Sequence, residues 1–218
     1  MFDEYPLSGS STAEVAARKA PYTPCFVQGS RIATDRGAIA VEDLREGDRV
    51  LTRDHGYRPI RWIGAREFTK AGLAEFPELM PVRISQGALD GVLPLADLIV
   101  SPQHRILVMQ RTDTKGDSEK LVAAATLTAL AGVEQYNPGE VIYYHLMFDA
   151  HEVICSEGAW SESFLPDAAA LDGMHEAQLA EILTIFPELA SAQGLTGYGG
   201  AARVCLDANS VLPAAIAA

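Results

Sequence analysis

Short segments in which apolar and polar residues alternate follow one another from residue 25 to residue 165, and turns rich in Gly, Pro, Asn and Asp separate them. Alternation with a period of two is typical of β-strands, and many short strands with frequent turns indicate an all-β body. Arg31 to Thr34 and Ala38 to Val41 flank Asp35-Arg36-Gly37 and predict a hairpin. The pattern therefore predicts a compact all-β fold built from short strands.

The same pattern predicts the remaining elements of the body. Further strands are expected over Arg49 to Arg53, Tyr57 to Gly64, Pro81 to Ser85, Asp97 to Gln110 with a break at Ser101-Pro102, Glu140 to Phe148, and His151 to Ser156. We expect a loop or short helix over residues 65–81, a polar hairpin loop over 111–118, and a strand that runs into a helical turn over 120–131.

The two ends of the chain differ from this body. Residues 1–24 are small and polar and end in Pro21-Tyr22-Thr23-Pro24, so they predict a flexible leader with too little apolar content to build a core. Beyond residue 165, apolar residues between His175 and Leu189 recur at helical spacing, and a tail rich in Gly and Ala follows. We therefore divide the chain into a leader (1–24), a β-domain (25–165) and a short helical C-terminal extension (166–218).

Charge and hydropathy exclude two classes of partner. The formal net charge is −12, and the basic residues are scattered among acids, which argues against a nucleic-acid surface because phosphate binding needs clustered Lys and Arg. No apolar run approaches the roughly twenty residues that span a bilayer. The composition therefore predicts a soluble protein with no membrane span.

The cysteine pattern bears on cofactors and on location. Cys25, Cys155 and Cys205 give an odd count and no C-x-x-C pair, so we expect no disulfide framework and no structural zinc site. We also predict no cofactor and no metal. A free thiol at Cys25 suits a reducing compartment. Residues 1–24 contain no apolar h-region. The sequence thus predicts a cytoplasmic protein, or one exported without a visible Sec signal.

The candidate chemistry centres on Cys25, which follows the leader directly. A cysteine sulfur can attack the peptide bond that precedes its own residue, giving a thioester and releasing the nitrogen as an amine. Because a thiol pKa near 8.5 leaves little thiolate at neutral pH, such a site needs a neighbouring base, and a histidine fits that role. Cys25 as a buried structural cysteine is the alternative.

Two later segments supply hydroxyl and imidazole groups. In Ser101-Pro102-Gln103-His104, the proline holds a bend in which the Ser101 and His104 side chains can face one peptide. His145, Asp149 and His151 occupy odd positions of one segment and would share one face of a regular strand. A core or surface role for His104, and a merely polar strand face for the second group, are the alternatives.

These motifs together resemble the Hint domain, the fold that hedgehog autoprocessing domains and inteins share. The resemblance covers residues 25–165 and rests on Cys25-Phe26-x-x-Gly29-x-x-Ile32-Ala33-Thr34, Val41-Glu42-Asp43-Leu44-x-x-Gly47-Asp48, Ser101-Pro102-Gln103-His104 and Tyr144-His145-Leu146 with Asp149-x-His151. Arg61-Trp62-Ile63-Gly64 and Gly158-Ala159-Trp160-Ser161-Glu162-Ser163 are similar to motifs of its bacterial branch. The resemblance implies a compact horseshoe of short strands with the Cys25 end buried at its centre.

The resemblance also implies roles. Cys25 would be the nucleophile of an N–S acyl shift, while Ser101 and His104 would polarise the Pro24 carbonyl and protonate the Cys25 nitrogen. His145 stands where inteins often have Asp, and His151 matches the late His of the family.

Two features of the family have no counterpart in the chain. No His-Asn pair ends the late strand, so intein-type splicing is not expected, and no Asp stands where hedgehog domains activate a sterol. We therefore predict an autoprocessing domain whose substrate is its own N-terminal segment, with water or a small external nucleophile resolving the thioester. The alternative is a non-catalytic Hint-like structural or binding module, and no protein partner is identified.

Overall fold

The structure is a computed structural model that describes residues 24–110, 118–206 and, for the backbone alone, 216–217. The expected leader lies outside these residues except for Pro24, as do the expected hairpin loop except for Ser118 and most of the tail beyond Leu206. The division of the chain into leader, β-domain and extension stays a prediction.

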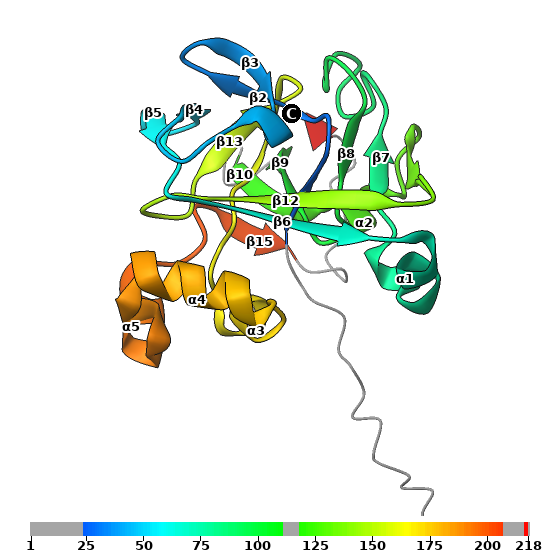
Figure 1. Cartoon of the computed structure of the whole chain (residues 1–218). Helices are drawn as coiled ribbons and strands as arrows, with labels where there is room; N and C mark the ends of the chain where they lie inside the picture. Colours follow the sequence, from blue (N-terminus) through cyan, green and yellow to red (C-terminus); the bar gives the residue numbers. More distant parts are fainter. Residues whose placement is uncertain (1–23, 111–117, 207–215, 218) are drawn as a thin grey trace, which may run out of the picture.

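Two β-sheets form the body and confirm the all-β class (Figure 1). The six-stranded sheet has the order β11-β7-β8-β1-β12-β6, with bounds Val133–Gln135, Val82–Ile84, Leu98–Val100, Phe26–Val27, Val141–Met147 and Trp62–Phe68. The larger sheet has the order β15-β10-β9-β14-β13-β2-β4-β5, with bounds Val204–Leu206, Ser118–Ala123, Arg105–Gln110, Ala159–Glu162, Val153–Ser156, Arg31–Thr34, Arg49–Thr52 and Gly56–Pro59. β3 (Gly37–Ala40) pairs with β2, and β16 (Ile216–Ala217) pairs with β9.

The helices are short and lie outside the sheets. They are α1 (Lys70–Glu75), α2 (Ala124–Leu127), α3 (Ala168–Asp172), α4 (Glu176–Ile185) and α5 (Ala192–Tyr198), with 3₁₀ turns at Val41–Asp43, Pro77–Leu79 and Pro187–Ala190. No helix within the described ranges is both long and apolar enough to cross a membrane.

The expected strand from Tyr57 to Gly64 is wrong, because the chain changes sheets within it. The Ile60 N–H donates to Asp48 O next to β4, whereas the adjacent Arg61 N–H donates to Met147 O of β12. The segment therefore splits into β5 and β6, and β6 runs on to Phe68. The β2–β3 hairpin and the strand-to-helix change from β10 to α2 are as predicted.

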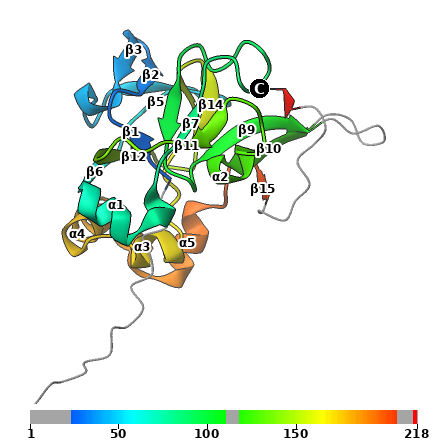
Figure 2. The same cartoon turned by 90° about the vertical axis from the view of Figure 1, so that its right-hand side faces the viewer.

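Strand β1 places Cys25 near the middle of the smaller sheet. Phe26 pairs with Tyr144 of β12 on one side and with Val100 of β8 on the other. Immediately after β1 the chain turns back, with Gly29 at φ +91°, a conformation that glycine adopts without strain. Cys25 thus lies between the end of β8 and the middle of β12. Figure 2 shows β1, the strand that Cys25 precedes, next to β12.

The main core lies between the two sheets. Fully buried side chains such as Phe26 and Val100 of the smaller sheet pack in one cluster with Ile32 and Ile154 of the larger. A second cluster joins β6 and β12 to the C-terminal helices, which gather on one side of the body (Figure 1). Its members include Trp62, Met147, Phe164, Leu171, Ile182, Phe186 and Leu189. The helices of the C-terminal extension are therefore packed onto the β6–β12 strand pair.

Candidate active site

Ser101 makes hydrogen bonds to both the N–H and the carbonyl oxygen of Cys25. The Cys25 N–H donates to Ser101 Oγ over 3.0 Å, and the Ser101 N–H donates to Cys25 O over 3.0 Å. Ser101 directly follows β8, which pairs with β1, so the sheet register itself brings the hydroxyl to the nitrogen of Cys25. Both residues are buried. The hydroxyl thus contacts the nitrogen that would leave if the preceding peptide bond were cleaved.

His145 of β12 contacts the other side of the same peptide. Its Nδ1 lies 3.0 Å from Pro24 O and 3.4 Å from Cys25 Sγ, and its Nε2 lies 3.6 Å from that sulfur. Since a carbonyl oxygen can only accept, the contact with Pro24 O requires the proton of neutral His145 on Nδ1. Nε2 is then the unprotonated ring nitrogen, and the sulfur lies nearly equidistant from the two nitrogens, beside the ring rather than in line with the Nε2 lone pair. One imidazole therefore contacts both the carbonyl oxygen and the sulfur.

Aromatic packing fixes the His145 ring. The Trp62 ring lies nearly parallel to it at 6.2 Å, and the Phe164 ring lies at 5.5 Å with edge-to-face geometry. Gly64 pairs with His145 across the sheet, and a Cβ at Gly64 would lie only 2.2 Å from the Trp62 ring. The glycine of the Arg-Trp-Ile-Gly motif therefore makes room for the indole that holds the imidazole.

Burial keeps His145 uncharged at neutral pH. The His145 pKa is lowered to about 4, mainly by desolvation and in smaller part by the nearby Arg66 cation, while the hydrogen bond to Pro24 acts to raise it. A neutral ring is the form that can accept a thiol proton.

A cavity of about 10 Å³ adjoins Cys25, and it is lined by Cys25, Arg66, Phe68, Leu79, Ser101, Tyr143 and His145. This volume is enough for about one water molecule. The Arg66 guanidinium lies 4.7 Å from the Phe68 ring centroid, and desolvation lowers the Arg66 pKa. Within the described ranges no ion pair is found for Arg66. Sequence patterning did not single out Arg66, which reaches the cavity because β6 pairs with β12.

His104 makes no hydrogen bond to the Cys25 nitrogen. Its ring packs edge-to-face on Phe26 at 4.4 Å, and neither ring nitrogen has a hydrogen-bond partner within the described residues. The His104 N–H donates to Ser101 O over 3.0 Å. Burial lowers the His104 pKa to about 4. The structure therefore gives the contact with the Cys25 nitrogen to Ser101 and the contact with the Pro24 carbonyl to His145.

His151 and Asp149 lie apart from the Pro24–Cys25 peptide. The buried His151 has its Nε2 3.4 Å from Glu162 Oε2 and accepts the Ala202 N–H at Nδ1 over 2.9 Å. Asp149 pairs with Arg61 at the surface over 2.7 Å, with 65% of its side chain exposed. His145, Asp149 and His151 do not share one strand face, because β12 ends at Met147. Asp149 is thus not brought to the site.

Glu162, which the sequence places in a family motif but in no site role, is a fully buried carboxylate. It accepts the Arg105 N–H at 2.8 Å and the Arg105 Nη1 at 2.9 Å. Burial acts to raise the Glu162 pKa, but His151, Arg105 and His104 together hold it below its usual value. The described part of the chain contains no group of three His, Cys, Asp or Glu side chains that could hold a metal ion.

The two buried histidines predict a loss of stability in acid. The pKa values of His104 and His145 are about 4 in the folded protein against about 6.5 in the unfolded chain. Between these values the unfolded chain binds more protons, so stability is full above pH 6.5 and is lost as the pH falls toward 4. We expect the free energy of unfolding in urea to fall by about 2 kcal/mol per histidine between pH 7 and pH 5.

Single Gln substitutions provide the control for this pH effect. His145→Gln should remove about half of the loss, and His175→Gln, at an exposed position, should leave it unchanged. Equal stability of the parent at pH 7 and pH 5 would contradict the account of buried neutral imidazoles.

Comparison with known families places this geometry in context. Residues 24–168, more than half of the chain, match the family described as Hint domain. No curated protein matches the chain.

Solved structures similar to the chain include three inteins or intein-like domains. They are the gp41-1 intein (10% identity, 63% of this chain and 97% of that chain covered, TM-score 0.38), a bacterial intein-like domain from Clostridium thermocellum (14%, 64% and 97%, 0.37) and a DnaB intein from Synechocystis sp. PCC 6803 (8%, 64% and 98%, 0.40). Likenesses at this level of identity and TM-score say nothing about the activity of the chain.

Proposed function

Because the chain belongs to the Hint domain family, we propose that it is an autoprocessing domain that cleaves its own Pro24–Cys25 peptide bond through an N–S acyl shift, without splicing. The observation that carries the proposal is the position of the His145 ring, which contacts both the Pro24 carbonyl and the Cys25 sulfur. The carbonyl that is attacked and the sulfur that attacks it thus both contact the same imidazole ring.

The first step is attack by sulfur. His145 Nε2 accepts the thiol proton, and the sulfur forms a bond to the carbonyl carbon of Pro24. The negative charge that develops on Pro24 O is stabilised by the Nδ1–H, which already lies 3.0 Å from that oxygen in the ground state. Burial strengthens this interaction because little water competes for the oxyanion.

The second step is loss of nitrogen. The C–N bond breaks, its electron pair stays on the Cys25 nitrogen, and the proton taken from sulfur ends on that nitrogen. The Ser101 hydroxyl, 3.0 Å from the nitrogen, can turn from acceptor to donor as the amide becomes an amine. The product is a thioester between the Pro24 carbonyl and the Cys25 sulfur, with a free amine at Cys25.

Hydrolysis completes the reaction. A water attacks the thioester carbonyl, the C–S bond breaks, and the products are a carboxylate at Pro24 and a free Cys25 thiol. The cavity beside Cys25 accommodates about one water. Its lining by Arg66 favours negative charge next to the reacting carbon. A small external thiol can replace water, since thiols exchange readily with thioesters.

Incubation with dithiothreitol tests the proposed function. We expect a time-dependent release of residues 1–24 and a fragment that begins at Cys25, both read as intact masses. The rate should rise with dithiothreitol concentration, because the thiol intercepts the thioester. An unchanged full-length mass under all conditions would favour the non-catalytic module instead.

A further inference from the structure

The buried His151 is held by a residue that lies outside the family match. Ala202 follows α5, and its N–H donates to His151 Nδ1 over 2.9 Å. Because a backbone N–H can only donate, Nδ1 must be unprotonated, and the proton of neutral His151 must sit on Nε2. Nε2 then lies 3.4 Å from Glu162 Oε2, beyond the usual hydrogen-bond range, so the interaction of that proton with the carboxylate is electrostatic. The C-terminal extension therefore selects the tautomer of His151.

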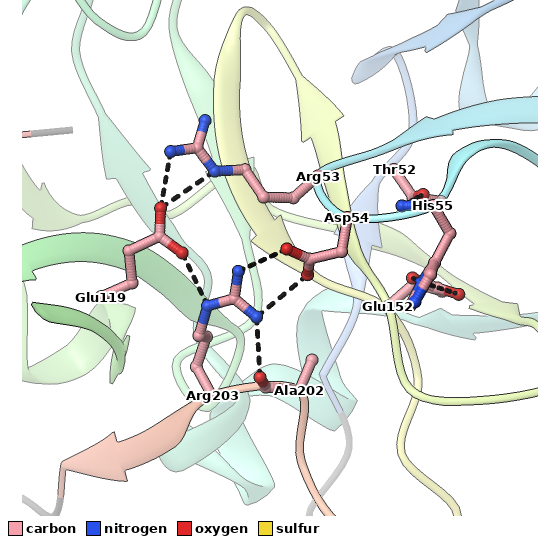
Figure 3. A network of polar contacts seen from close by, with 8 residues as sticks. All are labelled: Thr52, Arg53, Asp54, His55, Glu119, Glu152, Ala202 and Arg203. Atoms are coloured by element: carbon pink, nitrogen blue, oxygen red, sulfur yellow. Dashed lines mark hydrogen bonds and ion pairs between the residues drawn. The ribbon is translucent and has the colours of Figure 1, made fainter.

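A network of ion pairs holds Ala202 in this place (Figure 3). The next residue, Arg203, binds both oxygens of Asp54 at 2.7 and 2.9 Å and Glu119 at 2.6 Å. Glu119 also accepts from Arg53 at 2.5 and 3.0 Å. The hydrogen bond from Arg203 lowers the Asp54 pKa, so this carboxylate stays charged. Two-pronged Arg–carboxylate pairs of this kind fix geometry as well as charge.

The turn between β4 and β5, which carries Asp54, also contacts the residue that follows His151. His55 follows Asp54 and pairs through Nδ1 with Glu152 at 2.9 Å, and Glu152 is the residue after His151. Figure 3 shows the two contacts side by side, with Asp54 on Arg203 and His55 on Glu152. The turn therefore docks the C-terminal segment and the His151 segment against one another.

A series of contacts leads from His151 to Cys25, and its first link is the 3.4 Å electrostatic contact between His151 Nε2 and Glu162 Oε2. Glu162 accepts the Arg105 N–H at 2.8 Å, and the preceding His104 N–H donates to Ser101 O at 3.0 Å. Ser101 in turn bonds both the N–H and the carbonyl of Cys25. The segment from Ser101 to Arg105 is thus anchored by Glu162 at one end and holds Cys25 at the other.

We infer that Ala202 and Arg203 are positioning residues of the site: Arg203 docks the C-terminal extension so that the Ala202 N–H fixes the His151 tautomer, and through Glu162 this orders the 101–105 segment that holds Cys25. The effect on cleavage rests on the proposed function, whereas the effect on the His151 tautomer does not. Neither residue touches the reacting peptide.

The test is the tautomer of His151, read from its two ring-nitrogen resonances in ¹⁵N-labelled protein. Five histidines make assignment by single His→Gln variants practical. The parent should show a protonated Nε2 and an unprotonated Nδ1. Ala202→Pro removes the N–H and should give a mixture of tautomers, whereas Ala202→Gly keeps the N–H and should keep the parental tautomer.

Arg203→Met provides a second variant in case Ala202→Pro does not fold. This substitution leaves every backbone donor in place but removes the ion pairs of Arg203 with Asp54 and Glu119. Arg36→Met, which removes the exposed ion pair with Asp48, is its matched control. In a parent that cleaves itself, Arg203→Met and Ala202→Pro should each slow release of the leader about 10-fold, the factor for one buried hydrogen bond. Arg36→Met should not.

The outcomes separate this inference from the proposed function. A parental tautomer in both Ala202→Pro and Arg203→Met overturns the inference, whatever the parent cleaves. A changed tautomer with unchanged cleavage overturns the link to Cys25. If the parent does not cleave, the proposed function fails, and amide exchange of the Arg105 N–H then tests the inference. Faster exchange in the two variants, together with the tautomer change, supports the inference. An Arg105 exchange rate equal to that of the parent contradicts it.

Discussion

Cys25→Ala is expected to abolish release of the N-terminal segment completely. The proposed reaction has no step that can proceed without the sulfur, since the thioester is formed on it and neither of the other two thiols lies at the Pro24 carbonyl. The fold should persist, because the exchange removes one small buried atom from a site whose backbone hydrogen bonds to Ser101 remain. The measurement is the intact mass of the variant after incubation with dithiothreitol beside the parent.

The other two cysteines are the matched controls for this prediction. Cys155 and Cys205 are free, partly buried thiols of β13 and β15 in the larger sheet, whereas Pro24 precedes β1 of the smaller sheet. Cys155→Ala and Cys205→Ala should therefore release the leader at the parental rate. Release from Cys25→Ala, or loss of release in either control, would contradict the assignment of Cys25 as the nucleophile.

His145→Gln is expected to slow the reaction by about 10²–10⁴-fold, the usual contribution of a positioned general base. Glutamine keeps a hydrogen-bond donor near Pro24 O but cannot accept and pass on the thiol proton. The effect should shrink as the pH rises toward the thiol pKa, because hydroxide then supplies the thiolate. Rates from a time course of fragment mass at several pH values measure it.

His104→Gln distinguishes proton transfer by His145 from proton transfer by His104, the role that the family resemblance implies. Neither ring nitrogen of His104 hydrogen-bonds Pro24 or the Cys25 nitrogen, and the His104 backbone N–H, which the substitution retains, donates to Ser101 O. The loss of rate should therefore be smaller than for His145→Gln. A larger loss for His104→Gln would mean that the imidazole of His104, not that of His145, carries the proton transfer.

Much of the site could be predicted because its residues lie next to turns and strand ends. Ser101 follows a strand that pairs with β1, and His145 occupies the middle of the other neighbour of β1, so both reach the Pro24–Cys25 peptide through simple pairing. Asp149 shows the limit of this reasoning. The alternation of side chains holds only while the strand continues, and β12 ends two residues before Asp149.

Residues that depend on distant pairings could not be predicted. Glu162 lies at the end of β14, a strand that the sequence pattern does not predict. The polar residues Ser161 and Glu162 are both buried there, so the strand does not alternate between apolar buried and polar exposed residues. Its partners Arg105 and His151 come from two other segments. Ala202 acts through its backbone N–H, which no residue pattern can reveal.

The C-terminal helices illustrate the same limit at the level of the fold. The helix from Glu176 to Ile185 follows from its apolar spacing, but α3 and α5 are too short to show a period. They form because Leu171 and Leu195 find apolar partners in the cluster around Trp62 and Phe164. Tertiary packing therefore stabilises these two short helices, which the local sequence pattern alone does not predict.

Trapping with hydroxylamine tests the central claim, a thioester between the Pro24 carbonyl and the Cys25 sulfur, most directly. Hydroxylamine attacks a thioester far faster than an amide and leaves a hydroxamate on the acyl group. We predict a released leader that ends in a hydroxamate at Pro24, a complementary fragment that begins at Cys25, and neither product from Cys25→Ala. A leader that ends elsewhere, or one that ends in a carboxylate whatever the hydroxylamine concentration, would contradict the claim.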